Sequence, residues 1–100
     1  MKIKTYVSII LIILLSFQGY AQKAKVAAAD KKYEQYAYID AISTYERVAE
    51  KGYKDEKMFQ KLGNAYYFNA ELDKAAKWYG ELFLMNENQE PEYLYRYSQT

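Results

Sequence analysis

The sequence predicts an all-α fold built from helix–turn–helix units that repeat. The first observation is spacing, because the apolar residues of 38–49 recur at intervals of three and four, as on one face of a helix. The second is register, because adding 34 to each residue number carries this pattern onto 72–83. The third is a pair of helix-breaking residues, because Gly52 lies between the two periodic segments and Pro91 follows the second. Residues 22–100 are therefore expected to hold about two and a half units of this length.

The register between the two units extends over six apolar positions. Adding 34 to the residue number aligns each apolar residue of the first set with one of the second. The first set is Tyr38, Ala41, Ile42, Tyr45, Val48 and Ala49, and the second is Leu72, Ala75, Ala76, Tyr79, Leu82 and Phe83. Tyr33 superimposes on Tyr67 by the same shift. Such self-similarity at a fixed period is the mark of a repeat architecture, in which neighbouring units bury a continuous core.

Residues 1–21 have the three-part plan of a secretory signal peptide. Lys2 and Lys4 give a positive start, the run from Tyr6 to Phe17 is largely apolar, and Gly19-Tyr20-Ala21 offers small residues around a larger one. Cleavage after Ala21 would leave Gln22 as the new N-terminus. The alternative is an uncleaved membrane anchor. A spanning helix needs about 20 apolar residues, however, and the run from Tyr6 to Phe17 is shorter than that.

Five helices are expected along the chain. In the first unit they cover about 23–35 and 38–51, with Gly52 as the stop. In the second they cover about 56–69 and 71–85, with Asp55 as the N-cap. Pro91 suits the first turn of a last helix. Tyr93, Tyr95 and Tyr97 alternate and, taken alone, could form a strand or a stacking platform, but the repeat register favours a helix whose rings pack against the core.

The second unit resembles the tetratricopeptide repeat family. Phe59, Leu62, Gly63 and Tyr66 fall on the W-x2-L-G-x2-Y segment of that repeat, and Ala75 and Tyr79 fall on its A-x3-F segment. The resemblance covers most of residues 22–100. It departs from the family in the first unit, where Lys25 and Ala28 stand in place of an aromatic residue and a leucine. The family implies an antiparallel helix-pair solenoid, here with an incomplete third repeat.

Gly63 is expected to be the small place over which the partner helix packs in this repeat. The corresponding residues of the other units, Ala29 and Ser98, are also small. A glycine within a helix costs about 1 kcal/mol relative to alanine. Leucine at this place should therefore overpack the contact, whereas alanine is expected to be tolerated because helix propensity improves.

Composition excludes several kinds of chemistry. The chain has no cysteine and no histidine, so disulfides, thiolate metal sites and histidine-based catalysis are absent. The formal net charge of +1 gives no sign of a nucleic-acid partner. Asp30 and Glu34 could share a helix face, but carboxylates at this spacing beside Lys31 and Lys32 are usually solvated. We therefore expect no catalytic residue, no cofactor, no metal and no small-molecule substrate.

The resemblance implies a concave face formed by the first helix of each repeat, where a protein or peptide partner binds. In the second unit that face is predicted to comprise Lys57, Gln60, Asn64, Tyr67 and Phe68. Aromatic anchors in such a groove would suit an extended peptide or a helix. The basic and asparagine pattern of a chaperone-type carboxylate clamp is not reproduced, since Gln60 and Asp30 do not fit it.

The layout of a signal peptide followed at once by a tyrosine-rich repeat looks like the start of OmpA-family envelope proteins that accompany the type IX secretion system. This resemblance implies a protein-interaction scaffold in the periplasm or on the periplasmic side of the outer membrane. It implies contact with membrane only through the cleaved leader or a partner. Two alternatives stay open, namely the adaptor region of a peptidoglycan-binding anchor and the non-catalytic N-terminal module of an envelope enzyme.

The first prediction concerns the leader. The mature protein isolated from its native envelope is expected to begin at Gln22, and its intact mass should lack residues 1–21. Retention of Met1 to Ala21 in that mass would contradict export by cleavage and favour the membrane anchor.

Overall fold

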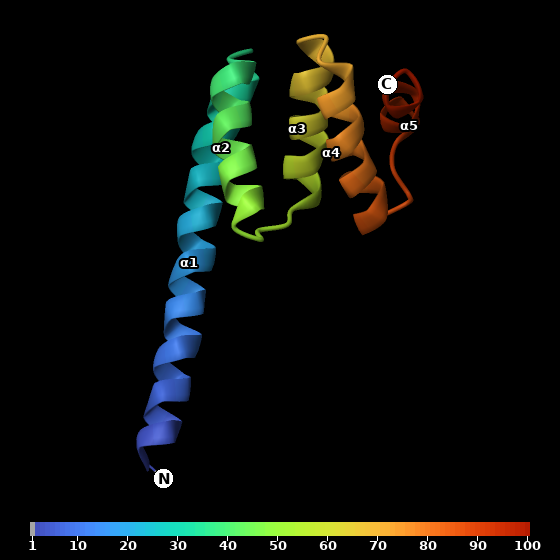
Figure 1. Cartoon of the computed structure of the whole chain (residues 1–100). Helices are drawn as coiled ribbons and strands as arrows, with labels where there is room; N and C mark the ends of the chain where they lie inside the picture. Colours follow the sequence, from blue (N-terminus) through green and yellow to red (C-terminus); the bar gives the residue numbers. More distant parts are fainter. Residues whose placement is uncertain (1) are drawn as a thin grey trace.

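The computed structural model describes the backbone of residues 2–100 and the side chains of residues 4, 6–11 and 19–100. Within this part the chain is all-helical, which confirms the predicted class. The helices are α1 (Lys2–Glu34), α2 (Tyr38–Glu50), α3 (Glu56–Phe68), α4 (Leu72–Met85) and α5 (Pro91–Ser98). Each helix packs against the next, and α1 also contacts α3. Figure 1 shows the chain running up and down through these helices from one side of the bundle to the other.

Helix α1 is longer than the sequence predicted. A helix was expected to begin near Lys23, but α1 continues without a break from Lys2, and its first half extends beyond the other helices (Figure 1). The reason is local, because the only helix breaker at the junction is Gly19, and the alanine-rich residues that follow favour helix. No helix formed by the described residues combines the length and the apolar character needed to cross a membrane. Met1 and the side chains of 2, 3, 5 and 12–18 lie outside the described residues, so cleavage after Ala21 stays a prediction.

The predicted helix ends are confirmed at three places. The Asp55 carboxylate accepts a hydrogen bond of 2.8 Å from the backbone N–H of Met58 and so caps α3. Gly52 has a φ of +91°, the left-handed conformation that glycine adopts without strain after a helix. Pro91 begins α5, where its fixed φ suits the first turn. The tyrosines after it therefore lie on a helix and not on a strand.

The turn within each helix pair has the same backbone geometry in both units, in the register of the apolar pattern. Tyr36 and Ala70 both have a left-handed φ, of 61° and 60°. The N–H of Ala37 donates to the carbonyl of Lys32, and at the equivalent place in the second unit the N–H of Glu71 donates to the carbonyl of Tyr66. Both turns close a helix by the same six-to-one hydrogen bond. The repeat seen in the apolar pattern is thus also a repeat of backbone conformation.

One core runs through α1, α2, α3 and α4. Its buried side chains include Phe59, Leu62, Tyr66 and Tyr79 of the segments that resemble the tetratricopeptide repeat, together with Val26, Ala29, Ala41, Ile42, Tyr45, Val48, Met58, Ala65, Ala75, Trp78 and Leu82. Helix α5 has no buried residue, and Tyr93 and Tyr97 pack against the core while partly exposed. Leu94 and Tyr95 stay more than half exposed. The core therefore ends at the α4–α5 contact.

Gly63 lies against the ring of Tyr79, as expected of a small residue over which the partner helix packs. A Cβ atom at residue 63 would lie 2.5 Å from both Cδ1 and Cε1 of that ring. Tyr79 is fully buried and its hydroxyl is hydrogen-bonded, so the ring has no room to retreat. The expectation that alanine is tolerated at this place is therefore wrong, because even one methyl group overlaps the ring.

The second prediction follows from this contact. Gly63→Ala should lower the free energy of unfolding by about 1–3 kcal/mol, because the clash outweighs the gain in helix propensity. Gly80→Ala on α4 is the matched control. Its Cβ would meet only the Tyr97 hydroxyl, at 3.3 Å, on a side chain that is partly exposed and can shift. Chemical denaturation that gives equal stability for the two variants would contradict a close contact between residue 63 and the Tyr79 ring.

Candidate partner-binding face

The five residues predicted to bind a partner share one face of α3, because their spacing follows the helical period. We call Lys57, Gln60, Asn64, Tyr67 and Phe68 the α3 face. Its members differ in access. Lys57 is exposed, Phe68 is 48% exposed, and Gln60 and Tyr67 are half-buried. Asn64 is only 6% exposed, which differs from the expectation of a residue open to a partner.

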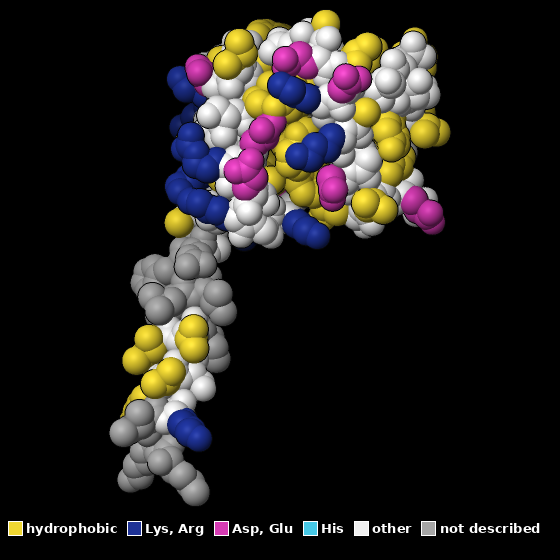
Figure 2. All heavy atoms as spheres, in the orientation of Figure 1, with side chains coloured by type: hydrophobic (Ala, Val, Ile, Leu, Met, Phe, Trp, Pro, Cys, Tyr) yellow, Lys and Arg dark blue, Asp and Glu magenta, His cyan; other side chains and the backbone are white. Residues whose placement is uncertain are grey.

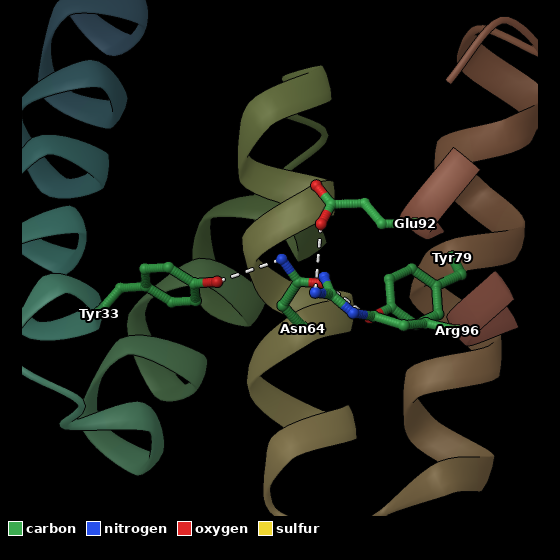
Figure 3. A network of polar contacts seen from close by, with 5 residues as sticks. All are labelled: Tyr33, Asn64, Tyr79, Glu92 and Arg96. Atoms are coloured by element: carbon green, nitrogen blue, oxygen red, sulfur yellow. Dashed lines mark hydrogen bonds and ion pairs between the residues drawn. The ribbon is translucent and has the colours of Figure 1, made fainter. Parts of the chain in front are cut away.

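The amide of Asn64 is engaged at both ends (Figure 3). Its Oδ1 accepts a hydrogen bond of 2.7 Å from the Tyr79 hydroxyl and one of 2.9 Å from Nη1 of Arg96. Its Nδ2 donates to the Tyr33 hydroxyl at 3.2 Å. We call these four residues the asparagine cluster. It joins α1, α3, α4 and α5 through a single side chain.

Arg96 closes this cluster from α5. Its guanidinium carbon lies 5.2 Å from the centre of the Phe68 ring and 5.9 Å from that of Tyr93. The same guanidinium forms an ion pair of 3.3 Å with Glu92, one turn earlier on α5. Figure 3 shows the arginine reaching from α5 toward Asn64. Arg96 therefore ties α5 to the Asn64 amide, and the sequence alone did not place it there.

Burial disfavours the charged form of the two tyrosine hydroxyls in the cluster. Burial raises the pKa of Tyr79 well above its usual range, and the positive charge of Arg96 only partly opposes this. Burial likewise raises the pKa of Tyr33, against a lowering by its hydrogen bond to Asn64. Both hydroxyls thus stay neutral at ordinary pH, and the Tyr79 hydroxyl donates to Asn64 throughout.

A second polar contact fixes α1 against α2 and α3. The Tyr45 hydroxyl donates to Asp30 at 2.5 Å, and the Lys61 ammonium pairs with the same carboxylate at 3.1 Å. Lys61 also lies 5.8 Å from the centre of the Tyr33 ring. Asp30, considered above as a possible acid, is therefore held by two partners.

The loop after α4 covers one end of the α3 face. Gln60 donates to the Gln89 side chain at 2.9 Å, and Gln89 in turn donates to Glu56 at 2.6 Å. Asn86 donates to the same Glu56 carboxylate at 3.1 Å. Gln60 is thus partly occupied by the chain itself, which leaves Lys57 and Phe68 as the freely accessible members of the predicted set.

The residues that sequence reasoning missed are Tyr33, Lys61 and Arg96. Tyr33 carried a signal, because the register of the repeat superimposes it on Tyr67 of the predicted face. Arg96 stood out only as the one basic residue that the third unit offers to the concave face, and Lys61 carried no signal. The roles of both depend on how neighbouring units pack. Among the described residues, no group of three or more acidic side chains is gathered closely enough to hold a metal ion.

Comparison of the chain with protein-family models, with characterised proteins and with solved structures gave no significant match.

The third prediction tests the asparagine cluster. Asn64→Ala should lower the free energy of unfolding by about 1–3 kcal/mol, since it leaves the buried Tyr79 hydroxyl and the Arg96 guanidinium without their acceptor. Gln60→Ala is the control on the same helix face, where one half-buried hydrogen bond to a loop is lost and the change should be much smaller. If urea denaturation shows that the two variants lose equal stability, the cluster does not hold the helices together.

Proposed function

We propose that this chain is an exported, tetratricopeptide-type helical-repeat module that serves as a protein–protein interaction scaffold in the bacterial cell envelope. The observation that carries the proposal is the recurrence of one backbone turn in the register of the sequence repeat, at Tyr36 and at Ala70. The packing of the Tyr79 ring on Gly63 supports it, because that contact falls on the two segments by which the sequence resembles this family.

The contacts between helices support the proposed order of the helices in a solenoid. Helix α1 contacts α3 as well as α2, and the asparagine cluster links α1, α3 and α5. The first helices of successive units thus lie along one side in this proposal, and the second helices α2 and α4 lie along the other. That arrangement gives the α3 face its role as the middle of a shared binding surface.

The position of the apolar leader supports export. Tyr6, Val7, Ile9, Ile10 and Leu11 are 48–63% exposed on the part of α1 that extends beyond the bundle (Figure 1). These side chains contribute little to the core, so their removal with a signal peptide would cost the bundle little stability. In the proposal the mature module lies in the periplasm or on the periplasmic side of the outer membrane, as the resemblance to OmpA-family proteins implies.

The surface of the bundle suits a protein partner. Figure 2 shows charged side chains of both signs around exposed apolar ones on the side that faces the viewer. The accessible part of the α3 face offers the ammonium of Lys57 and the half-exposed ring of Phe68. Aromatic anchors are enriched at the core of protein interfaces and charged groups lie at the rim, and here the two groups lie at opposite ends of α3.

The fourth prediction tests the face. A photo-reactive phenylalanine analogue placed at Lys57 should cross-link a discrete protein in the native envelope, because this residue is exposed on the α3 face. The same analogue at Lys77 is the control, an exposed lysine on α4 on the other side of the bundle. Cross-linking from residue 77 but not from residue 57 would assign the interaction to the α2–α4 side and contradict the proposal.

A further inference from the structure

A group of aromatic side chains surrounds a hollow at the turn between α1 and α2. The hollow measures about 470 Å³ and is lined by Tyr33, Glu34, Tyr36, Tyr38 and Phe68, which we call the tyrosine hollow. Figure 1 shows that this turn lies at the same end of the bundle as the turn between α3 and α4, next to the end of α3. The hollow therefore adjoins the α3 face, with which it shares Phe68.

Two of the ring pairs around the hollow meet at steep angles and a third is tilted. Tyr38 meets Tyr33 at 62° with ring centres 5.4 Å apart, and it meets Tyr36 at 88° with centres 6.1 Å apart. Phe68 lies 5.7 Å from Tyr38 and tilted by 35°. Rings at such angles can line several sides of one space, whereas a platform for stacking a flat ligand needs parallel rings. The geometry suits a compact cation.

The turn between α1 and α2 presents an exposed ring at Tyr36. Tyr36 has a φ of 61°, a conformation that glycine or asparagine adopts at lower cost, and its side chain is 78% exposed. The equivalent turn residue in the next unit is Ala70, so the turn itself requires no aromatic residue. The left-handed φ is therefore a property of the turn, and the exposed ring is what distinguishes the turn at Tyr36 from the turn at Ala70.

The charges around the hollow favour a positively charged occupant. Lys61 beside Tyr33 is paired with Asp30, and Arg96 over Phe68 is paired with Glu92. Glu34 is exposed at the rim, and no ion pair formed by the described residues engages it. Lys31 and Lys32, which precede it on α1, line a different hollow together with Ala24, Ala27, Ala28 and Gln35. One unpaired carboxylate beside aromatic faces is the combination that receives a guanidinium or an ammonium group.

We propose that the tyrosine hollow binds an arginine or lysine side chain of the partner polypeptide. The inference rests on the proposed function for the source of the cation, and it deepens that function by naming the chemistry that the partner presents at this end of the α3 face. Rings of Tyr36 and Tyr38 would contact the cation, and Glu34 would pair with it at the rim.

The test is a titration of the isotope-labelled full chain followed by amide chemical shifts. The probe is the peptide acetyl-Gly-Arg-Gly-amide, and its neutral isostere contains citrulline in place of arginine. The arginine peptide should shift the amides of 34–38 and bind at least threefold more tightly than the citrulline peptide. Equal binding of the two peptides, or no shift at 34–38 with the arginine peptide, would overturn the inference. Choline is the third probe, and tighter binding of choline than of the arginine peptide would also overturn it in favour of a free quaternary ammonium ligand.

Substitutions distinguish the contribution of the Tyr36 ring to binding from that of the turn backbone. Tyr36→Gly should weaken arginine-peptide binding about two- to fivefold, as expected for one exposed ring, while leaving the melting temperature unchanged or higher because the left-handed strain is relieved. Ala70→Gly is the matched control, with the same backbone change and no effect on binding. Glu34→Gln should weaken binding without altering the melting temperature. Unchanged binding in both Tyr36→Gly and Glu34→Gln would overturn the inference.

The outcomes for the hollow and for the proposed function are distinguishable. The peptide titration requires no partner protein, and cross-linking from residue 57 requires no peptide. Absence of cross-linking from residue 57 together with normal arginine-peptide binding would contradict the scaffold function and leave the cation site intact. Normal cross-linking together with absent arginine-peptide binding would contradict the cation site alone.

Discussion

The Asn64 amide is the constraint on which the arrangement of the helices depends. A buried amide without partners would cost a few kcal/mol, so α1, α4 and α5 must each deliver a group to it. Tyr33, Tyr79 and Arg96 do so, within 3.2 Å. Apolar packing brings helices together with some freedom to slide, but three directed hydrogen bonds on one side chain fix their mutual positions. The cluster thus sets the alignment of the face that it lies beneath.

The apolar contact between Gly63 and Tyr79 also fixes the position of α4 against α3. Tyr79 packs on α3 only because residue 63 has no side chain, and from that position its hydroxyl reaches Asn64. Packing and hydrogen bonding are therefore coupled, since a methyl group at residue 63 would displace the donor as well as the ring. The two effects on stability should not be additive, because they share one side chain.

Stability and recognition are divided between the middle and the ends of the α3 face. The middle of the α3 face is consumed by internal contacts, with Asn64 buried and Gln60 bonded to the α4–α5 loop. Exposed groups remain at Lys57 and, at the other end of α3, at Phe68 next to Tyr36 and Tyr38. A partner in our proposal would therefore be recognised mainly at the ends of the face and would lie across a rigid centre.

The sequence by itself determined the helical class, most helix ends and most of the core, because these follow from local periodicity, from caps such as Asp55 and from the left-handed turn at Gly52. It also placed the predicted site residues on one helix face. It did not determine which of them are accessible, and it misjudged both Asn64 and the effect of alanine at residue 63. Only the tertiary structure decided these points, because Arg96 lies 32 residues from Asn64 along the chain and Tyr79 lies 15 residues from it. Contacts of that separation depend on how whole helices pack, and no local pattern encodes them.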